Sequence, residues 1–360
     1  MRSSLGNVED VFSQIGYKTT KCGLVTARII EPKSRRTCLN LDKSAAERGS
    51  EVSAEELLSP SQATPDVSEQ TIRLITVTYN PGSELERFLA SIAPATSAKV
   101  NVYIADNGAQ HELVDELAAK YNATVVRDPN TDRGYGPGNL GYGGGVNFAA
   151  KDLSEDWIVV ANPDLVFRPG ALDVLVAAGL ANKRAGSLGP RLLNTDGTVY
   201  PSGRALPTLG RGAGHAFLGR IWPSNPLTKA YHGTNEDTIH PVGWLSGACL
   251  LLPRKVWQKL GGFDDAYFMF FEDVDLGARV GKAGYENLQV PGSVVVHEQG
   301  ASWKARPENM IRAHHASARL YMSRIYPHLW QAPLRGAINA GLSLREEMEV
   351  RRPNQRTKHA

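Results

Sequence analysis

Three acidic residues follow a run of large apolar side chains late in the chain. Glu272, Asp273 and Asp275 come shortly after the sequence Tyr-Phe-Met-Phe-Phe at 267–271. A carboxylate beside aromatic surface loses hydration, which is costly unless the acid is paired, protonated or used in a reaction. Acids are also favoured in the first turn of a helix, and apolar residues recur at helical spacing behind these three. We therefore expect Asp275 to be a helix-start residue, and Glu272 and Asp273 to take part in chemistry.

A second group of candidates stands where short apolar runs end. Asp164 closes the sequence Asn-Pro-Asp after the run at 157–161, and His297 ends the run at 293–297. A hard cation that binds phosphate oxygens needs one or two carboxylates at such a position, and an imidazole can complete its coordination sphere. Taken alone, Asn-Pro-Asp is better explained as a strand-ending turn, and a lone histidine as a hydrogen-bonded edge residue.

Two further segments suggest contact with a nucleotide. Asp106 ends an apolar run and is followed by Asn-Gly, which predicts either a tight turn or a carboxylate that accepts a hydrogen bond from a nucleobase or ribose. The glycine-rich stretch at 139–147 matches neither the phosphate-loop nor the dinucleotide pattern, because Val146 occupies the last glycine position. We expect this stretch to let the backbone approach a ligand closely, with Asn147 opening a helix.

The elements around these residues determine where they lie. Between residues 72 and 161, short β-rich runs alternate with helical patterns, which predicts an α/β fold with a mostly parallel sheet. Ligands bind at the carboxyl ends of the strands in such sheets. The polar residues that end the strands, Asn80, Asp106 and Asp164, should therefore gather at one edge.

Composition limits the class of protein. The chain has 360 residues, of which 42% are hydrophobic and 21% charged, with a net charge of +3. These values are ordinary for a globular protein, and the charge is too small to indicate a nucleic-acid partner. Three cysteines without motif spacing argue against a disulfide framework and favour a reducing compartment. No stretch approaches the ~18 uninterrupted apolar residues of a membrane span, and the N-terminus lacks a hydrophobic signal core. We expect a cytoplasmic protein that at most lies on a membrane surface.

The chain divides into three parts. Residues 42–70 are rich in Ser, Ala, Glu and Pro and contain no aromatic residue, so they bury too little surface to offset the entropy of ordering. We predict a disordered extension over 1–70, the α/β domain over 71–305, and a helical, basic segment over 306–360.

The last of these parts mixes aromatic and basic residues. Such a mixture suits an anionic membrane interface, although a solvated basic face with a few core aromatics explains it nearly as well. The residues concerned are Trp303, Tyr321, Tyr326 and Trp330, interleaved with Lys304, Arg306, Arg312, Arg319, Arg324, Arg335, Arg345, Arg351 and Arg352.

Several short motifs occur in one order along the chain. They are Thr-Tyr-Asn-Pro at 78–81, Ala-Asp-Asn-Gly at 105–108, the glycine-rich stretch at 139–147, Asn-Pro-Asp at 162–164, Gly-Trp-Leu-Ser-Gly-Ala at 243–248, Phe-Met-Phe-Phe-Glu-Asp-Val-Asp-Leu at 268–276 and Val-His at 296–297. Together they resemble the family 2 glycosyltransferases with the GT-A fold, over roughly residues 72–335. Each motif is weak alone, but the set in register is specific.

The resemblance implies a nucleotide-sugar donor and a divalent metal, Mg²⁺ or Mn²⁺. Asp164 would hold the metal on the donor diphosphate, with His297 as a further ligand. The family usually has Asp-x-Asp, whereas Asn162 takes the first position here, which leaves fewer charged ligands. The residues implied in binding the nucleotide sugar are Thr78, Tyr79, Asp106, Asn139, Gly141, Asn147 and Asn162.

The resemblance also implies an inverting transfer with acceptor residues in the second half of the chain. Asp273 would be the general base, and Glu272 its orienting neighbour or an acceptor contact. The aromatic run at 267–271 would form the floor of the sugar pocket. The residues implied in binding the acceptor are Trp244, Ser246 and Gly247.

A narrower likeness concerns the substrates. The stretches at 159–164, 188–190, 197–202, 241–247 and 267–269 resemble the rhamnosyltransferases of actinobacterial cell-wall linker synthesis. This likeness implies dTDP-L-rhamnose as donor, N-acetylglucosaminyl-diphospho-polyprenol as acceptor, and a peripheral position on the inner face of the plasma membrane.

Three alternatives remain open at this point. One is another sugar transfer, such as a different rhamnosyl transfer or galactofuranose from a UDP donor onto a polyprenyl glycan. The others are a non-catalytic nucleotide-sugar-binding subunit and a dinucleotide-dependent oxidoreductase, which the misplaced glycine pattern disfavours. The oligomeric state is also open, a homo-oligomer included.

Overall fold

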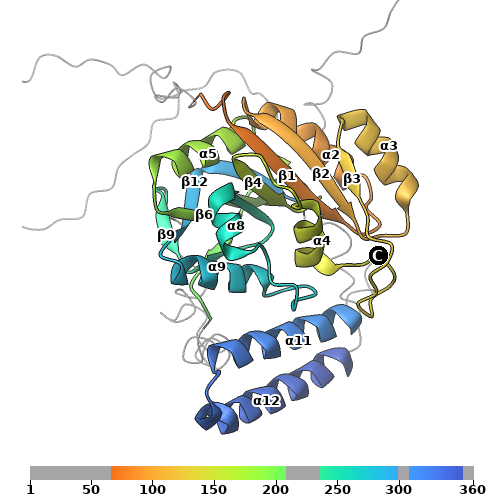
Figure 1. Cartoon of the computed structure of the whole chain (residues 1–360), viewed down its shortest axis with the longest axis vertical. Coiled ribbons are helices and arrows are strands. Elements are labelled where there is room, and N and C mark those ends of the chain that lie inside the picture. The colour runs from red at the N-terminus through yellow and green to blue at the C-terminus, as the bar shows by residue number, and fades with distance from the viewer. Residues whose placement is uncertain (1–65, 208–235, 299–307, 352–360) are drawn as a thin grey trace, which may run out of the picture. The chain divides into compact units, whose positions relative to one another are not determined.

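The chain folds around one mixed β-sheet (Figure 1). The computed structural model describes residues 66–207, 236–298 and 308–351. Along the sheet the strand order is β3, β2, β1, β4, β11, β6, β12, β5, with β7 paired to β6 and β9 paired to β12. A separate two-stranded ribbon joins β8 and β10.

The first half of the sheet is parallel, as predicted. β1 pairs with β2 and β4, and β2 pairs with β3, all in parallel. Because Thr78 lies in register with Asp106, the carboxyl ends of β1 and β2 meet at one edge. The elements are β1 (Thr71–Thr78), α2 (Glu84–Ile92), η1 (Ala93–Ala95), β2 (Lys99–Asp106), α3 (His111–Tyr121), β3 (Thr124–Val126), α4 (Gly141–Ala149) and β4 (Trp157–Ala161).

The second half of the sheet contains the antiparallel strands. β11 runs antiparallel between β4 and β6, so the loop that precedes β11 lies at the edge where β4 ends. At this edge Asn162 N donates a hydrogen bond to Ala248 O over 2.8 Å. The elements are β5 (Leu165–Phe167), α5 (Ala171–Ala181), β6 (Ala185–Asn194), β7 (Val199–Tyr200), β8 (Gly203–Arg204), β9 (His240–Val242), β10 (Trp244–Leu245), β11 (Cys249–Pro253), α8 (Arg254–Leu260), α9 (Glu272–Lys282) and β12 (Glu286–His297).

Helices cover both faces of the sheet, because alternate strand side chains point to opposite faces. In β4, Val159 and Ala161 pack in the apolar cluster that includes α2, α3 and α5. Ile158 and Val160 pack in the cluster that includes α4, α8 and α9, the helices in front of the sheet in Figure 1. The core therefore has two layers, one on each face of the sheet.

Two C-terminal helices follow the sheet. α11 (Glu308–Ile325) confirms the helix predicted within 306–360, and η2 (Leu329–Gln331) leads into α12 (Ala332–Arg351). The two helices lie side by side in Figure 1. Glu346 of α12 accepts hydrogen bonds from Arg312 and Arg319 of α11, at 3.1 and 2.8 Å. Among the described helices, none is both long and apolar enough to cross a membrane.

The predicted extension over 1–70 falls mostly outside the described residues. Its last five residues, however, belong to the fold. Val67 is buried, and Gln70 Oε1 accepts a hydrogen bond from Trp157 Nε1 over 2.9 Å. The described fold therefore includes residues that the prediction assigned to the extension.

Candidate active site

The carboxylate of Asp106 is surrounded by donors at the end of β2. Its Oδ1 accepts hydrogen bonds from Thr78 Oγ1 at 3.3 Å and Gly108 N at 3.2 Å. Its Oδ2 lies 2.7 Å from His111 Nδ1 and 2.8 Å from Arg127 Nε. The structure brings Thr78 and Asp106 together as expected. It also adds His111 and Arg127 to this corner, and the sequence patterns indicated neither of them.

The turn after β1 leaves one aromatic ring on the surface. Tyr79 is 59% exposed. The next residue, Asn80, has a left-handed backbone with φ of 49°. Its Oδ1 accepts hydrogen bonds from Ala109 N and Gln110 N, at 2.9 and 3.1 Å. Asn80 thereby ties together the ends of β1 and β2, beside an accessible Tyr79.

Asp164 and His297 lie together where β4 and β12 end. His297 Nε2 is 3.2 Å from Asp164 Oδ1, and their side chains are only 10% and 16% exposed. The ring of Tyr200 meets the His297 ring edge-on, with centroids 5.6 Å apart. His297 Nδ1 is buried and has no hydrogen-bond partner among the described residues. The structure therefore juxtaposes the two residues predicted to bind metal.

This pair suits a divalent metal that shares its coordination with a diphosphate. Carboxylate oxygen and imidazole nitrogen are both ligands for such ions, and a metal at phosphate groups needs only one or two protein carboxylates. Across residues 66–207, 236–298 and 308–351, no group of three His, Cys, Asp or Glu side chains is arranged to hold a metal. Asn162 is fixed here through its backbone hydrogen bond to Ala248 O. Among the described residues this pair could supply two ligands, and a bound substrate would have to supply others.

The first turn of α4 packs against the aromatic loop that precedes α9. Gly141 has φ of 74°, and a Cβ there would lie 2.0 Å from Phe268 O, so only glycine fits. Gly141 N donates to Asn139 Oδ1 over 3.0 Å, and its carbonyl accepts from Asn107 Nδ2 over 2.9 Å. The Asn139 side chain and the Gly141 backbone therefore shape this loop beside Asp106.

Asn147 has a different place from the one expected. It lies inside α4 and does not open the helix. Its Nδ2 donates to Phe263 O and to Asp265 Oδ1, at 2.8 and 2.7 Å, and its Oδ1 accepts from Phe263 N. Both ends of the amide are thus used to hold the loop after α8. Asn147 acts as a tie within the protein and is dropped from the proposed donor site.

Asp273 lies at the start of α9 with each carboxylate oxygen held by one backbone N–H. Gly247 N donates to Oδ2 and Val274 N to Oδ1, each over 2.8 Å. The carbonyl of Gly247 accepts the hydroxyl of Tyr142 at 2.5 Å. Burial raises the pKa of Asp273, and the two N–H groups and the charge of Arg204 oppose this rise. Each oxygen keeps a lone pair with which to accept a proton.

The other two acids of the cluster, Glu272 and Asp275, have different surroundings. Glu272 is buried, and its Oε2 has no hydrogen-bond partner among the described residues. Burial and the neighbouring Asp273 raise the pKa of Glu272 to about 8, so this carboxyl is largely protonated at pH 7. Asp275 pairs with Arg279 Nε at 2.6 Å along α9, in keeping with a structural helix-start residue.

The expected acceptor residues lie on β10 and in the loop after it, which contacts Asp273. Trp244 is buried, and its Nε1 donates to Ala205 O over 3.1 Å. Ser246 N donates to Ser202 O over 2.8 Å. Of these three residues, Gly247 is the one hydrogen-bonded to the candidate base. Trp244 is therefore no exposed platform for a sugar, and its contact with a ligand would have to be indirect.

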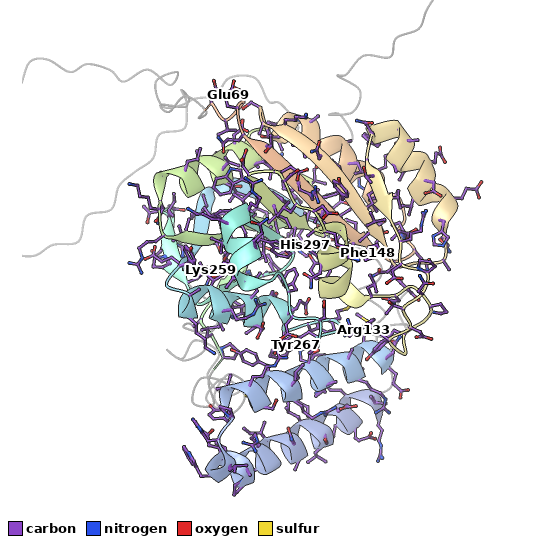
Figure 2. All side chains as sticks on the ribbon, in the orientation of Figure 1. Glu69, Arg133, Phe148, Lys259, Tyr267 and His297 are labelled. Carbon is purple, nitrogen blue, oxygen red and sulfur yellow. The ribbon has the colours of Figure 1, made fainter. Side chains whose placement is uncertain are left out.

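The aromatic run at 267–271, before α9, contacts several neighbouring segments of the chain. Tyr267 is fully buried, and Arg133 beside it donates to its carbonyl (Figure 2). Phe268 stacks on Tyr135 with centroids 3.6 Å apart. Ser317 Oγ of α11 donates to Met269 O over 2.8 Å. The prediction that this run forms the floor of a sugar pocket is wrong for Tyr267, whose ring is inaccessible.

Two residues of this run have unusual backbone geometry. Phe270 and Phe271 both have positive φ, 69° and 65°, which is rare for bulky residues and costs of order 1–3 kcal/mol each. The ring of His314 in α11 packs against both. Phe271 also packs against Tyr321. α11 thus supports a strained turn that leads directly into Glu272 and Asp273.

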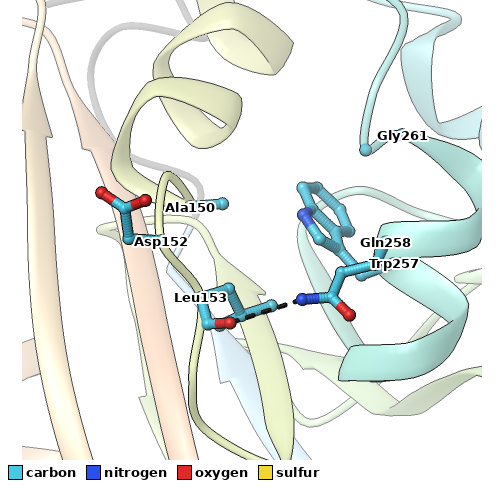
Figure 3. Close-up of a pocket in the computed structure, with 7 residues that line it drawn as sticks. Ala150, Asp152, Leu153, Trp257, Gln258 and Gly261 are labelled. Atoms are coloured by element: carbon cyan, nitrogen blue, oxygen red, sulfur yellow. Dashed lines mark hydrogen bonds between the residues drawn. The ribbon is translucent and has the colours of Figure 1, made fainter.

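A separate hollow of about 250 Å³ lies between α8 and the end of α4 (Figure 3). Trp257 and Gln258 line one side, and Gln258 Nε2 donates to Leu153 O over 3.5 Å. Asp152 is the one titratable residue in its lining. The hollow contains none of the residues discussed above.

Comparison with known proteins places the chain in a family. A family model described as glycosyltransferase like family 2 matches residues 70–316. The chain is 43% identical over 290 residues to the N-acetylglucosaminyl-diphospho-decaprenol L-rhamnosyltransferase of Mycobacterium tuberculosis, an alignment that covers 77% of this chain and 92% of that protein. This chain belongs to the family 2 glycosyltransferases. The family predicted from the motifs is confirmed.

Family membership makes the protein a glycosyltransferase enzyme, as predicted. The predicted GT-A fold is also confirmed, with a mostly parallel central sheet between helices, one antiparallel strand beside β4, and C-terminal helices. The oxidoreductase alternative is thereby excluded.

More distant matches were also found. Rhamnosyltransferase WbbL of Escherichia coli K12 is 25% identical over 195 residues, which cover 52% of this chain and 72% of that protein. The solved mannosyltransferase PcManGT from Pyrobaculum calidifontis, in complex with GDP-Man and Mn²⁺, is 16% identical with a TM-score of 0.44, and the match covers 76% of this chain and 75% of that one. These likenesses are too distant to assign any residue of the site.

Proposed function

We propose that this glycosyltransferase moves L-rhamnose from dTDP-L-rhamnose to N-acetylglucosaminyl-diphospho-polyprenol, with inversion, in cell-wall arabinogalactan linker synthesis. The Mycobacterium tuberculosis relative, aligned over 92% of its length, is named for that rhamnosyl transfer. The observation that carries the proposal is the position of Asp273. Its loop partner Gly247 precedes Ala248, which is hydrogen-bonded to Asn162 two residues before Asp164. A candidate base and a candidate diphosphate site therefore share one edge of the sheet.

The reaction is a single displacement at the anomeric carbon. Asp273 accepts the proton of the acceptor hydroxyl as its oxygen bonds to that carbon. The bond from the carbon to the diphosphate oxygen breaks, and dTDP leaves. General-base assistance of this kind contributes about 10²–10⁴-fold to the rate. The N–H groups of Gly247 and Val274 hold the Asp273 carboxylate in one orientation for this transfer.

The donor diphosphate lies at Asp164 and His297. These residues would hold a divalent metal, Mg²⁺ or Mn²⁺, and such an ion, when bound, supplies positive charge to the diphosphate. The donor nucleoside lies at the ends of β1 and β2, where Tyr79 offers an exposed ring. Asp106 is saturated by protein donors, so it acts by holding Arg127 and His111 toward the nucleoside.

The lipid of the acceptor calls for contact with the membrane surface, and α12 with the turn before it supplies this contact. Leu329 is 87% exposed, Trp330 77%, Leu344 64% and Met348 49%. Trp is favoured at membrane interfaces because its ring is apolar and its N–H is polar. The enzyme is then peripheral on the inner face of the plasma membrane.

Charge contributes less to this contact than the sequence pattern suggested. Arg345 pairs with Glu349 at 2.8 Å, and Arg351 with Glu347 at 3.4 Å. Arg312 and Arg319 both pair with Glu346. Because these arginines already have acidic partners, the exposed apolar side chains are the main support for membrane contact. Trp303, Lys304, Arg306 and Arg352 lie outside the described residues.

Purified enzyme should be offered several nucleotide sugars with N-acetylglucosaminyl-diphospho-polyprenol. The proposal expects transfer from dTDP-L-rhamnose and at most trace transfer from UDP-galactofuranose. Preferred use of another donor would replace the substrate assignment. Binding of dTDP-L-rhamnose without transfer from any donor would favour a non-catalytic nucleotide-sugar-binding subunit.

A further inference from the structure

Arg204 stands on the ribbon that leads to the candidate base. β8 pairs with β10 so that Arg204 lies opposite Trp244. Its guanidinium carbon is 5.3 Å from the Trp244 ring centre and 5.8 Å from that of Tyr200. Its Nε donates to Pro201 O over 2.9 Å. Cations are attracted to aromatic faces, so two rings and one carbonyl fix the side chain.

The rest of the Arg204 guanidinium is not engaged by the described part of the chain. Within residues 66–207, 236–298 and 308–351, neither Nη atom has a hydrogen-bond acceptor and no carboxylate pairs with the side chain. Other arginines of the domain differ in this respect. Arg73 pairs with Glu155 at 2.9 Å, Arg127 with Asp106 at 2.8 Å and Arg279 with Asp275 at 2.6 Å. A fixed guanidinium whose two Nη groups have no acceptor among the described residues suits bidentate binding of a phosphate.

The residues around Arg204 connect it both to the candidate metal site at His297 and to the candidate base Asp273. On one side, Tyr200 bridges to His297 through an edge-on ring contact. On the other side, Asp273 is close enough for the positive charge of Arg204 to oppose the rise in its pKa. Because Arg204 sits on the β8–β10 ribbon, which continues into Gly247, it belongs to the base side of the site. The end of β4, with Asp164, is the other side.

We propose that Arg204 binds a phosphate of the diphosphate that links the acceptor sugar to its lipid. This inference rests on the proposed function and deepens it. A diphosphate held at Arg204 would anchor the acceptor beside Asp273, with the reacting hydroxyl toward the donor. The same chemistry would also suit the donor diphosphate, so the two sources have to be separated by experiment.

The test compares Arg204→Gln and Arg204→Lys with the unaltered enzyme on two acceptors. One is N-acetylglucosaminyl diphosphate on a short lipid chain, and the other is octyl N-acetylglucosaminide, which has no phosphate. Binding of each is measured by titration calorimetry without donor, and kcat/KM with dTDP-L-rhamnose. Arg184→Gln serves as the control, because Arg184 is a 69% exposed arginine on the surface.

The proposal expects Arg204→Gln to weaken binding of the diphosphate acceptor by about 10- to 100-fold, the range for a charged hydrogen bond. Binding of octyl N-acetylglucosaminide and the KM for dTDP-L-rhamnose should stay unchanged, and Arg204→Lys should recover part of the loss. Equal loss with both acceptors would overturn the proposal in favour of a purely structural role. A raised donor KM with unchanged acceptor binding would assign Arg204 to the donor diphosphate instead.

The two proposals fail in different ways. If no rhamnosyl transfer occurs with either acceptor, the proposed function fails. The ratio of the two binding constants in unaltered enzyme and in Arg204→Gln still decides whether Arg204 recognises the diphosphate.

Discussion

Gly247 donates its backbone N–H to Asp273 Oδ2 over 2.8 Å while its carbonyl accepts the hydroxyl of Tyr142. A Cβ at position 247 would lie 3.3 Å from Asp273 Cβ and 3.5 Å from Tyr142 Cε1. The backbone of one residue, Gly247, thus contacts both α4 and α9 and orients the candidate base. Since the backbone orients Asp273, the chemistry of its side chain can be tested with little change to the fold.

Asp273→Asn removes the proton acceptor and keeps the shape of the side chain. We expect kcat to fall by about 10²–10⁴-fold, with unchanged binding of dTDP. The melting temperature should fall slightly, because the amide has one acceptor oxygen for the two backbone N–H groups that bind the carboxylate. Steady-state kinetics and thermal unfolding check this. Asp237→Asn, at an 88% exposed carboxylate, is the matched control. A variant that keeps near-normal turnover would remove Asp273 as the base.

Glu272 should make stability depend on pH. Its pKa is about 8 in the folded protein, against an ordinary value of 4.5. Between these values the native state keeps a proton that the unfolded state loses, so its contribution to the free energy of unfolding falls as pH rises. Each pKa unit corresponds to about 1.4 kcal/mol, so the loss is on the order of a few kcal/mol.

Glu272→Gln should lack this loss. Urea unfolding at pH 5, 6.5 and 8 should show the variant gaining on the unaltered enzyme as pH rises. Glu116→Gln, at an exposed position of α3, should run parallel to the unaltered enzyme. Parallel curves for Glu272→Gln as well would contradict a buried, protonated Glu272.

His297→Gln should weaken retention of a divalent metal in the presence of dTDP. Removing one of two protein ligands is expected to lower Mn²⁺ affinity by at least about 10-fold, by analogy with the 10–100-fold effect of residues that support a ligand. Electron paramagnetic resonance of free Mn²⁺ measures this without turnover. His240→Gln is the control, since the polar contacts of His240 among the described residues are with the nearby Thr238 carbonyl and Glu236. Unaltered Mn²⁺ binding would exclude His297 as a metal ligand.

Trp330→Glu combined with Leu344→Glu should release the enzyme from vesicles. Both side chains are exposed on the C-terminal helices, so a charge there should not disturb packing but should oppose insertion at an interface. Co-sedimentation with vesicles should fall, while transfer to a short-chain, water-soluble acceptor should persist. Leu180→Glu, on α5 and 54% exposed, is the control. If the double variant still binds vesicles, this surface is not the membrane contact.

Regular patterns predicted regular elements well. The apolar run at 157–161 forms a strand with the same bounds, because a continuous apolar run is a local signal. α12 was harder to predict in detail because Pro333, Gly336 and Gly341 are poor helix formers. Its contacts with α11, which the local sequence does not reveal, stabilise it instead.

The site shows the same division between local and distant signals. Asp164 and His297 could be paired in advance because each follows a short apolar run and the family resemblance implies both as metal ligands; that β12 brings them to the same edge is seen only in the fold. Arg127 and Arg204 carry no motif, and only the folded chain shows which carboxylate or ring each one meets. Asn147 had the residue type of a ligand contact, but its amide is used by a loop more than 100 residues away in sequence.

Most residues on the two sides of the site come from separate stretches of chain. Thr78, Asp106 and Asp164 lie within or directly after the first four strands, whereas Arg204, Gly247 and Asp273 lie between residues 200 and 275. His297, at the end of β12, is the proposed donor-side residue that comes from the later part of the chain. On the proposed roles, a lineage can therefore alter the lipid-linked sugar it recognises by changing the stretch at 200–275, while the residues that bind the donor, His297 included, stay the same. Divergence among such enzymes should then be concentrated in the second half of the gene wherever the donor has stayed the same.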